Sequence, residues 1–335
     1  MDMINQTPQR NDDNDENPTS SSLVYSYTSP HELYGLSFQN NNKVPRLALG
    51  SIEMDNKNKI EIVEYRREKL TKVHSEQIEF PCTKLKWSPF ANSSILAASS
   101  DAMRIYNFNQ DNNKLYLNTT LVKTKQYNAP ITSFDWNVAN PALLGTVSID
   151  TTATIWDVNK SAMIKQIIVH DKDVYDICFS KKFENYFITT GADGSIRGFD
   201  LRNLDESDVL FENGDLTPMT RVSFNSQNEY FLSALCLEKN YFYIIDIRKK
   251  EDPYATFNTH TNVVNAMAWS PKSNAHLCTV SDDKTAYLWD IIDKNDDDPK
   301  MKFKANYEIN NVDWSESNPE WLAIVANKEL QLLKI

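Results

Sequence analysis

The chain has 335 residues, of which 41% are hydrophobic and 11% aromatic, so it holds enough apolar side chains for a large buried core. Its formal net charge of −11 argues against a general binder of nucleic acid or of anionic membranes, because phosphate contacts need Lys and Arg. No apolar run approaches the roughly 18 residues that a membrane-spanning helix needs. From the charge and the lack of such a run together we expect no direct contact with nucleic acid and no membrane partner.

The first 21 residues consist mainly of Asn, Asp, Gln, Pro, Ser and Thr. Such a segment buries too little apolar surface to offset the entropy of ordering, so residues 1–21 are predicted to be a disordered acidic tail. A function for this tail stays open. Residues 22–28 alternate between polar and large apolar or aromatic side chains, which predicts an isolated strand at the start of a folded domain spanning residues 22–335.

A large aromatic residue then recurs every 43 to 49 residues, each time at the end of a short β-type run. We call these seven positions the anchors: Phe38, Trp87, Trp136, Phe179, Phe224, Trp269 and Trp314. Seven anchors at this spacing predict seven copies of one supersecondary unit rather than separate domains. The predicted fold class is therefore all-β, a seven-bladed β-propeller.

Each of the last six anchors is followed, 19 to 21 residues later, by a second aromatic or aliphatic position. These positions are Tyr106, Trp156, Phe199, Ile245, Trp289 and Leu333. The last repeat ends at Ile335 and supplies only three strands. We therefore expect the strand at 22–28 to pair with the C-terminal repeat and close the ring, which removes an exposed sheet edge.

This repeat pattern resembles the WD-repeat family over residues 22–335. In that family a buried His, a Ser or Thr, a turn Asp and a Trp form a hydrogen-bonded chain across a blade. The resemblance assigns this network to His260, Ser281, Asp283 and Trp289 in blade six, to His170 and Asp193 in blade four, and to Ser148, Asp150 and Trp156 in blade three, where Tyr127 takes the His place. Recurrence at a fixed repeat position favours a structural role over acid–base catalysis, because a catalytic constellation is built once.

Four stretches are similar to one eukaryotic subfamily of WD-repeat proteins: residues 129–157, 169–180, 191–202 and 308–314. The subfamily contains the anthocyanin regulators, the transparent-testa-glabra proteins and an animal cullin-ligase-associated factor. The resemblance implies a non-enzymatic scaffold, which in animals holds dual-specificity tyrosine-regulated and homeodomain-interacting kinases and in plants holds helix-loop-helix and Myb transcription factors. We therefore expect a protein kinase or a transcription factor as partner. The chain departs from the pattern in its tail, in blade one and at Phe224, where Trp is expected.

Two repeats end in Asp-x-Arg, at Asp200–Arg202 and at Asp246–Arg248. Both resemble the ending by which some propellers dock the large adaptor of cullin-RING ubiquitin ligases. The alternative function is therefore a substrate receptor of such a ligase. The residue before Asp is not Trp in either repeat, and a second interpretation is that these arginines only pair with neighbouring acids.

A partner-binding rim is predicted at the entry to the innermost strands, four and six residues before each anchor, around the mouth of the central channel. Its residues are Glu32, Tyr34, Asp173, Tyr175, Asn265, Glu308 and Asn310. These positions hold three acids and no base, so we predict that the rim binds a short segment bearing Arg or Lys, with the tyrosines as flat anchors. Solvated turn residues are the alternative interpretation.

No sequence motif points to catalysis. The chain contains no Gly-rich phosphate loop, H-E-x-x-H or G-x-S-x-G, and its five histidines lack metal-ligand spacing. We expect no catalytic residue, metal or cofactor, and a monomeric propeller; a propeller hydrolase is the competing class. The four scattered cysteines and the absence of a signal peptide favour reduced thiols and a location in cytoplasm and nucleus.

Overall fold

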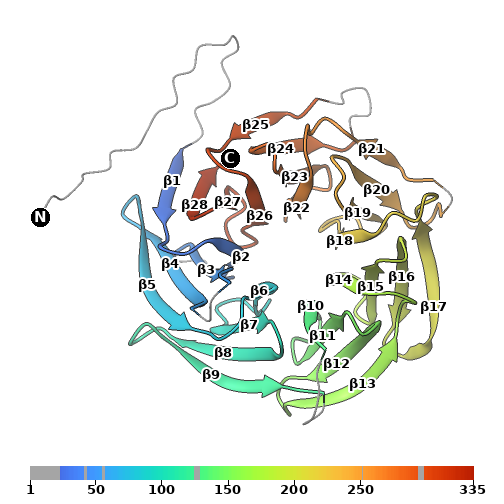
Figure 1. Ribbon diagram of the computed structural model, residues 1–335, viewed down its shortest axis with the longest axis horizontal. Coiled ribbons are helices and arrows are strands. Elements are labelled where there is room, and N and C mark those ends of the chain that lie inside the picture. Colours follow the sequence, from blue (N-terminus) through green and yellow to red (C-terminus); the bar gives the residue numbers. More distant parts are fainter. Residues whose placement is uncertain (1–22, 41–43, 55–56, 124–128, 251, 293–297) are drawn as a thin grey trace, which may run out of the picture.

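The computed structural model describes residues 23–40, 44–54, 57–123, 129–250, 252–292 and 298–335. Within these residues 28 strands form seven four-stranded antiparallel sheets, and they contain no helix that could span a membrane. The sheets stand as blades around a central channel (Figure 1). The predicted all-β, seven-bladed propeller is therefore confirmed. The predicted disordered tail, residues 1–21, lies outside the described residues.

The strands follow one another from the channel outward in each blade. Blade one contains β2 (Leu33–Phe38), β3 (Arg46–Ser51), β4 (Lys59–Arg66) and β5 (Lys69–Gln77). Blade two contains β6 (Lys84–Trp87), β7 (Ile95–Ser99), β8 (Met103–Asn109) and β9 (Lys114–Leu121). Blade three contains β10 (Ile131–Trp136), β11 (Leu143–Ser148), β12 (Thr152–Asp157) and β13 (Ala162–Ile168). Blade four contains β14 (Val174–Phe179), β15 (Tyr186–Gly191), β16 (Ser195–Asp200) and β17 (Asn203–Glu212).

The remaining blades repeat this plan. Blade five contains β18 (Met219–Phe224), β19 (Phe231–Cys236), β20 (Phe242–Asp246) and β21 (Ala255–Phe257). Blade six contains β22 (Val264–Trp269), β23 (His276–Ser281), β24 (Thr285–Asp290) and β25 (Met301–Lys304). Blade seven contains β26 (Ile309–Trp314), β27 (Trp321–Ala326) and β28 (Glu329–Lys334), with β1 (Val24–Thr28) as its outermost strand.

The hydrophobic core lies between neighbouring blades rather than inside each one. Every anchor is the last residue of an innermost strand and is buried. Trp136 of blade three, for example, belongs to one cluster with Met103 and Ile105 of blade two, and Phe179 of blade four shares a cluster with Val147 of blade three. An aromatic residue at this repeat position therefore holds adjacent blades together, which is why its spacing reveals the fold.

The ring closes as predicted. β1 pairs antiparallel with β28, from Val24 opposite Leu333 to Thr28 opposite Glu329. Two tyrosines of β1 also fasten it to blade one: the Tyr25 ring lies 4.7 Å from that of Tyr65, and the Tyr27 hydroxyl donates to Glu61 at 2.9 Å. The strand therefore completes blade seven and joins it to blade one.

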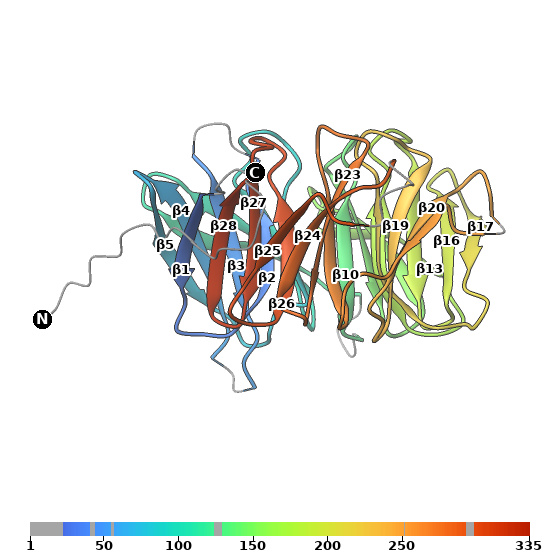
Figure 2. The ribbon, with the colours of Figure 1, turned by 90° about the horizontal axis from the view of Figure 1, so that it is seen from above.

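The loops lie on two opposite faces of the ring (Figure 2). We call mouth face the one where each innermost strand begins; it carries the loops between second and third strands and those that lead into the next blade. We call base face the one where the innermost strands end, and it carries the loops between first and second and between third and fourth strands. Any partner that binds one face leaves the other free.

Candidate functional site

Blade six contains a hydrogen-bonded chain that runs across the blade. The indole N–H of Trp289 donates to Thr279 Oγ1 at 2.8 Å, and the Thr279 hydroxyl lies 2.8 Å from His260 Nε2. His260 Nδ1 lies 2.8 Å from Asp283 Oδ2. Burial lowers the pKa of His260, so the ring is neutral, donates from Nδ1 to Asp283 and accepts from Thr279. The polar groups are thus satisfied within the blade, which fits a structural role.

The assignment of Ser281 to this chain was wrong. Trp289 lies opposite Leu277 on the neighbouring strand. Thr279 is two residues from that position, within diagonal reach, whereas Ser281 is four residues away, roughly 13 Å along the strand. Ser281 instead caps the turn, because its Oγ accepts from the backbone N–H of Asp283 at 3.1 Å.

Blade three needs the same correction. Trp156 donates to Thr146 Oγ1 at 2.9 Å, while Ser148 accepts from the backbone N–H of Asp150 at 3.3 Å. Lys123 Nζ lies 2.8 Å from the Asp150 carboxylate, so a lysine provides the positive partner of this turn acid. Tyr127, assigned to the His place, lies outside the described residues.

Blade four keeps the histidine but lacks the tryptophan. His170 Nδ1 lies 2.9 Å from Asp193 Oδ2, and His170 Nε2 lies 2.9 Å from Thr189 Oγ1. Phe199 cannot donate to Thr189 and instead stacks on Phe187, with ring centroids 5.2 Å apart. The His–Asp pairs in blades four and six are therefore repeated parts of the scaffold.

A cavity of about 570 Å³ opens at the mouth face of the channel. We call it the mouth cavity. All seven residues that lie four positions before an anchor line it: Tyr34, Thr83, Thr132, Tyr175, Thr220, Asn265 and Asn310. The structure thus brings together four of the predicted rim residues, the two tyrosines and the two asparagines. Their role in binding a partner stays a prediction.

Several of these residues also link neighbouring blades. Thr132 Oγ1 donates to the Val174 carbonyl at 2.6 Å, and Asn310 Nδ2 donates to the Leu33 carbonyl at 3.2 Å. Asn265 Nδ2 donates to the Ile309 carbonyl at 2.9 Å. The amides of the two predicted rim asparagines are thus already engaged in holding the ring, which leaves Tyr34 and Tyr175 as the rim side chains best placed for a ligand.

The three predicted rim acids lie elsewhere. Glu32, Asp173 and Glu308 are exposed on the mouth face, but they do not line the mouth cavity. They come just before the innermost strands begin, and the backbone carbonyls of Glu32 and Asp173 bind N–H groups of neighbouring loops. A contact between these acids and a basic segment would therefore form around the cavity rather than inside it.

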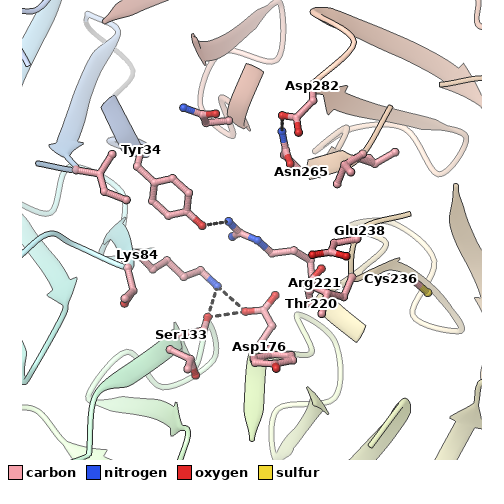
Figure 3. A pocket seen from close by; sticks show the side chains of 18 of the residues that line it. Tyr34, Lys84, Ser133, Asp176, Thr220, Arg221, Cys236, Glu238, Asn265 and Asp282 are labelled. Atoms are coloured by element: carbon pink, nitrogen blue, oxygen red, sulfur yellow. Dashed lines mark hydrogen bonds and ion pairs between the residues drawn. The ribbon is translucent and has the colours of Figure 1, made fainter. Parts of the chain in front are cut away.

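The positions predicted for the rim hold no base, but the mouth cavity contains two bases from a neighbouring repeat position. Lys84 and Arg221 line the mouth cavity, together with the carboxylate of Asp176 (Figure 3). All three residues lie three positions before an anchor, next to the positions that define the rim. Except in blade two, the strand register shifts at this point, and such a bulge re-aims adjacent side chains. Strict alternation along a strand would not place residues three and four positions before an anchor in the same cavity. Only their shared repeat position could have indicated that Lys84, Asp176 and Arg221 belong together.

The charged residues of the mouth cavity form a belt across blades (Figure 3). Lys84 Nζ lies 3.1 Å from Asp176 Oδ1 and 3.0 Å from Ser133 Oγ, and Ser133 donates to Asp176 at 2.5 Å. On the opposite wall Arg221 donates to the Tyr34 hydroxyl at 3.2 Å and so spans the channel from blade five to blade one. Burial alone would raise the pKa of Asp176, but Lys84 and Arg221 lower it, so the carboxylate is ionised.

A smaller cavity of about 220 Å³ lies toward the base face of the channel. Lys84, Asp176 and Arg221 line both cavities and therefore form the floor of the mouth cavity. Below them Lys86 pairs with Asp135 at 2.6 Å. Among the residues that the structure describes, no group of three His, Cys, Asp or Glu side chains could hold a metal ion.

The two Asp-x-Arg endings occupy equivalent places on the base face of blades four and five. Arg202 Nε and Nη2 donate to the two oxygens of Asp200 at 2.9 and 2.5 Å. Arg248 makes the same pair of contacts with Asp246 at 2.8 and 2.7 Å, and its guanidinium also lies 4.6 Å from the centroid of the Tyr230 ring. The arginine side chains nevertheless remain 75% and 56% exposed.

Exposed large apolar side chains gather on the mouth face. Nine of them lie in or beside its loops: Ile52, Met54, Phe80, Val122, Ile149, Ile168, Leu216, Leu237 and Tyr307. Five lie toward the base face: Leu23, Phe90, Phe183, Ile292 and Ile335. The mouth face therefore combines the mouth cavity with single exposed apolar side chains in its loops, of which Ile52 and Leu237 line the cavity.

Comparison with known proteins gives the family. The WD domain, G-beta repeat, matches residues 162–200 and 251–290. The chain is 37% identical, over 93% of its length, to the DDB1- and CUL4-associated factor 7 homolog of Dictyostelium discoideum, and the match covers 98% of that protein. The chain belongs to the WD-repeat family. Two fungal WD repeat-containing proteins are 30% identical to it: one of Schizosaccharomyces pombe, matched over 84% of its length, and one of Saccharomyces cerevisiae, matched over 59%.

The stretches that match the WD-repeat family contain residues of the hydrogen-bonded chains inside the blades. The family match at 162–200 and 251–290 includes both His–Asp pairs, of blades four and six. It does not include Lys84 or Arg221 of the mouth cavity.

Proposed function

We propose that this WD-repeat protein is a non-enzymatic adaptor that recruits a client protein to a cullin-RING ubiquitin ligase. Its base face docks on the large adaptor of the ligase, and its mouth face holds the client. The observation that carries the proposal is the pair of arginines, Arg202 and Arg248, which are held in the same way on neighbouring blades.

The hydrogen bonds of these arginines favour docking over a purely structural role. Two bonds to its own aspartate fix each guanidinium, which lowers the entropy lost when a partner binds. Nη1 of Arg202 and of Arg248 has no hydrogen-bond partner among the described residues, and both side chains are largely exposed. An exposed ion pair contributes little to folding, so the fold does not depend on these arginines.

The comparison with the Dictyostelium relative supports the same choice. The name of that protein associates it with DDB1 and CUL4, and this chain matches it along nearly its whole length. We extend that association to this chain as part of the proposal. None of the relatives reported above is named for a plant transcription regulator.

The client is proposed to be a protein kinase or a transcription factor, as the sequence resemblance implies. The mouth cavity, with Ile52 and Leu237 exposed in its lining, supports a protein client, because binding surfaces combine apolar and polar side chains. Such a client places the adaptor in cytoplasm and nucleus. A scaffold that works without the ligase would use the same mouth face and would not need Arg202 or Arg248.

A binding measurement with purified large ligase adaptor tests the proposal. The double change Arg202→Ala and Arg248→Ala should weaken binding by about 100-fold or more, because it removes two arginines at the centre of the proposed interface. Lys160→Ala is the matched control, since Lys160 occupies the corresponding loop of blade three and is 79% exposed. Equal affinity of the wild type and the double variant would refute docking through these arginines.

A further inference from the structure

We propose that the floor of the mouth cavity binds an acidic group of the client, a carboxylate or a phosphate, through Arg221. This deepens the proposed function and rests on it in taking the mouth face as the client face. It reverses the chemistry expected from the sequence, which placed a basic segment at the mouth.

Arg221 is a cation without a carboxylate of its own. Its only hydrogen bond to another side chain of the described residues is to the Tyr34 hydroxyl, at 3.2 Å, and no described carboxylate oxygen lies within 4.0 Å of its nitrogens. Burial would lower the pKa of Arg221, but Tyr34 and Asp176 raise it, so the guanidinium stays charged. Because a guanidinium offers five N–H donors, most of them remain available to a ligand.

Asp176 makes no ion pair with Arg221 and is held by other groups. One of its oxygens accepts from Lys84 Nζ and Ser133 Oγ, and the other accepts from the backbone N–H of Val222 at 3.1 Å. The carboxylate therefore pairs with Lys84 and ties blades two, three, four and five together. Its field stabilises Arg221 from a distance, but Lys84 and Arg221 together exceed it by one positive charge.

The positive charge of Arg221 lies where an entering ligand can reach it. The guanidinium extends across the cavity toward Tyr34 (Figure 3). A site enclosed by protein strengthens an ion pair relative to water, and a bidentate arginine selects planar acidic groups. The volume of about 570 Å³ admits one or two side chains of an entering segment.

The outer lining limits which acidic segments fit. Glu238 is exposed at the cavity edge, and Asp282 accepts from Asn265 Nδ2 at 2.6 Å. These acids would repel a run of negative charges. A single acidic group can bind Arg221 at the floor, while a basic residue beside it can lie near Glu238 and Asp282 at the edge. An apolar neighbour can instead contact Ile52 and Leu237, which also line the cavity.

Selection from synthetic peptide pools tests the inference with the isolated full-length protein. Each pool contains nonapeptides with random flanks around one fixed centre. The centres are Gln or Glu with an amidated C-terminus, phosphoserine with an amidated C-terminus, and Gln with a free C-terminal carboxylate. Peptides retained on the immobilised protein are counted by mass spectrometry. We expect at least one acidic pool to be retained about 10-fold over the amidated Gln pool, as a charged hydrogen bond predicts.

Two variants attribute that preference to Arg221. Arg221→Gln should abolish it, and Tyr34→Phe should reduce it about 3-fold, because it removes only the hydroxyl that holds the guanidinium. Melting temperatures close to the wild type show that both proteins are folded; if Arg221→Gln unfolds, Tyr34→Phe decides. Which pool is retained identifies a side-chain carboxylate, a phosphate or a chain end as the group bound.

The Arg202→Ala and Arg248→Ala double variant is the control that separates the two proposals. It should keep the full preference, because both residues lie on the base face. Equal retention of all pools by the wild type, or a preference unchanged in folded Arg221→Gln, would overturn the inference. Neither result would affect the proposed docking on the ligase, which is measured without a client.

Discussion

The interior of the blades and the mouth of the channel use polar side chains in opposite ways. Inside blades four and six a His–Asp pair and a threonine recur at the same repeat position, and their hydrogen bonds close within one blade. Around the channel the position three residues before the anchor holds a different amino acid in every blade: Gly35, Lys84, Ser133, Asp176, Arg221, Ala266 and Asn311. There the bonds cross between blades, and one cation is left over. Repeated residues thus build the blades, whereas the unrepeated channel residues both tie blades together, as Asp176 does, and leave Arg221 without an ion pair.

Removal of β1, the strand that closes the ring, should cause the largest loss of stability. Deletion of residues 1–28 removes β1 and exposes the edge of β28, together with Tyr65 and Trp321, which Tyr25 covers. We expect the whole propeller to lose stability, whereas deletion of residues 1–20 should leave the melting temperature unchanged. Equal melting temperatures for the two truncations, measured by calorimetry, would show that β1 does not close the ring.

Trp156→Ala should cost about 3–5 kcal/mol of unfolding free energy, through the cavity it leaves and the lost bond to Thr146. Denaturant unfolding measures this loss, with Lys160→Ala as a surface control on the same blade. The acidic-peptide preference at the mouth should survive in the folded fraction. A selective loss of that preference in a fully stable Trp156→Ala protein would contradict the division between interior and channel.

The channel acid Asp313 provides a pH test. Burial raises the pKa of Asp313 to about 6, although its carboxylate accepts from the backbone N–H of Phe38 at 2.7 Å. The unfolded chain releases this proton at about pH 4, so the folded state holds more protons between about pH 4 and 6, and this residue makes stability fall as pH rises through that range.

Asp313→Asn should remove this contribution, roughly 1–2 kcal/mol. Unfolding free energies measured at pH 4.5 and 7 should therefore differ less in the variant than in the wild type. Asp173→Asn, at an exposed acid, should leave the difference unchanged. The same pH profile for wild type and Asp313→Asn would show that Asp313 has an ordinary pKa in the folded protein.

Charge reversal of the outer acids should have the smallest effect. Asp173→Lys with Glu308→Lys changes two exposed side chains outside the mouth cavity, so the melting temperature should stay the same. If a client segment places a basic residue beside its acidic group, binding should weaken by about 3- to 10-fold, as expected for charges at the edge of an interface. Unchanged affinity for the selected peptides would limit recognition to the cavity itself.

The fold could be predicted from the sequence because its determinants repeat. Anchors such as Trp136 recur in every blade, and the missing fourth strand of the last repeat predicts the pairing of β1 with β28. The hydroxyl that links Trp289 to His260 was assigned to Ser281 instead of Thr279, because both residues face the same side of the strand. Only the strand register shows which one Trp289 reaches.

The channel site could be predicted only in part, because its chemistry depends on one copy of each residue. The repeat spacing gave Tyr34 and Tyr175 their place at the mouth. Nothing local in the sequence shows that Lys84 and Asp176 meet, since they are 92 residues apart and come from different blades. The bulge beside Asp176 also carries no sequence signature of its own.

The most direct test of the central claim is one purification of the tagged protein from its own cells, with quantitative mass spectrometry of what it retains. We compare the wild type, the Arg202→Ala and Arg248→Ala double variant, and Arg221→Gln. The account predicts that the double variant loses the cullin-ligase adaptor and keeps the client, while Arg221→Gln loses the client and keeps the ligase adaptor. Retention of the ligase adaptor by the double variant, or loss of both partners in each variant, would contradict an adaptor with two independent faces.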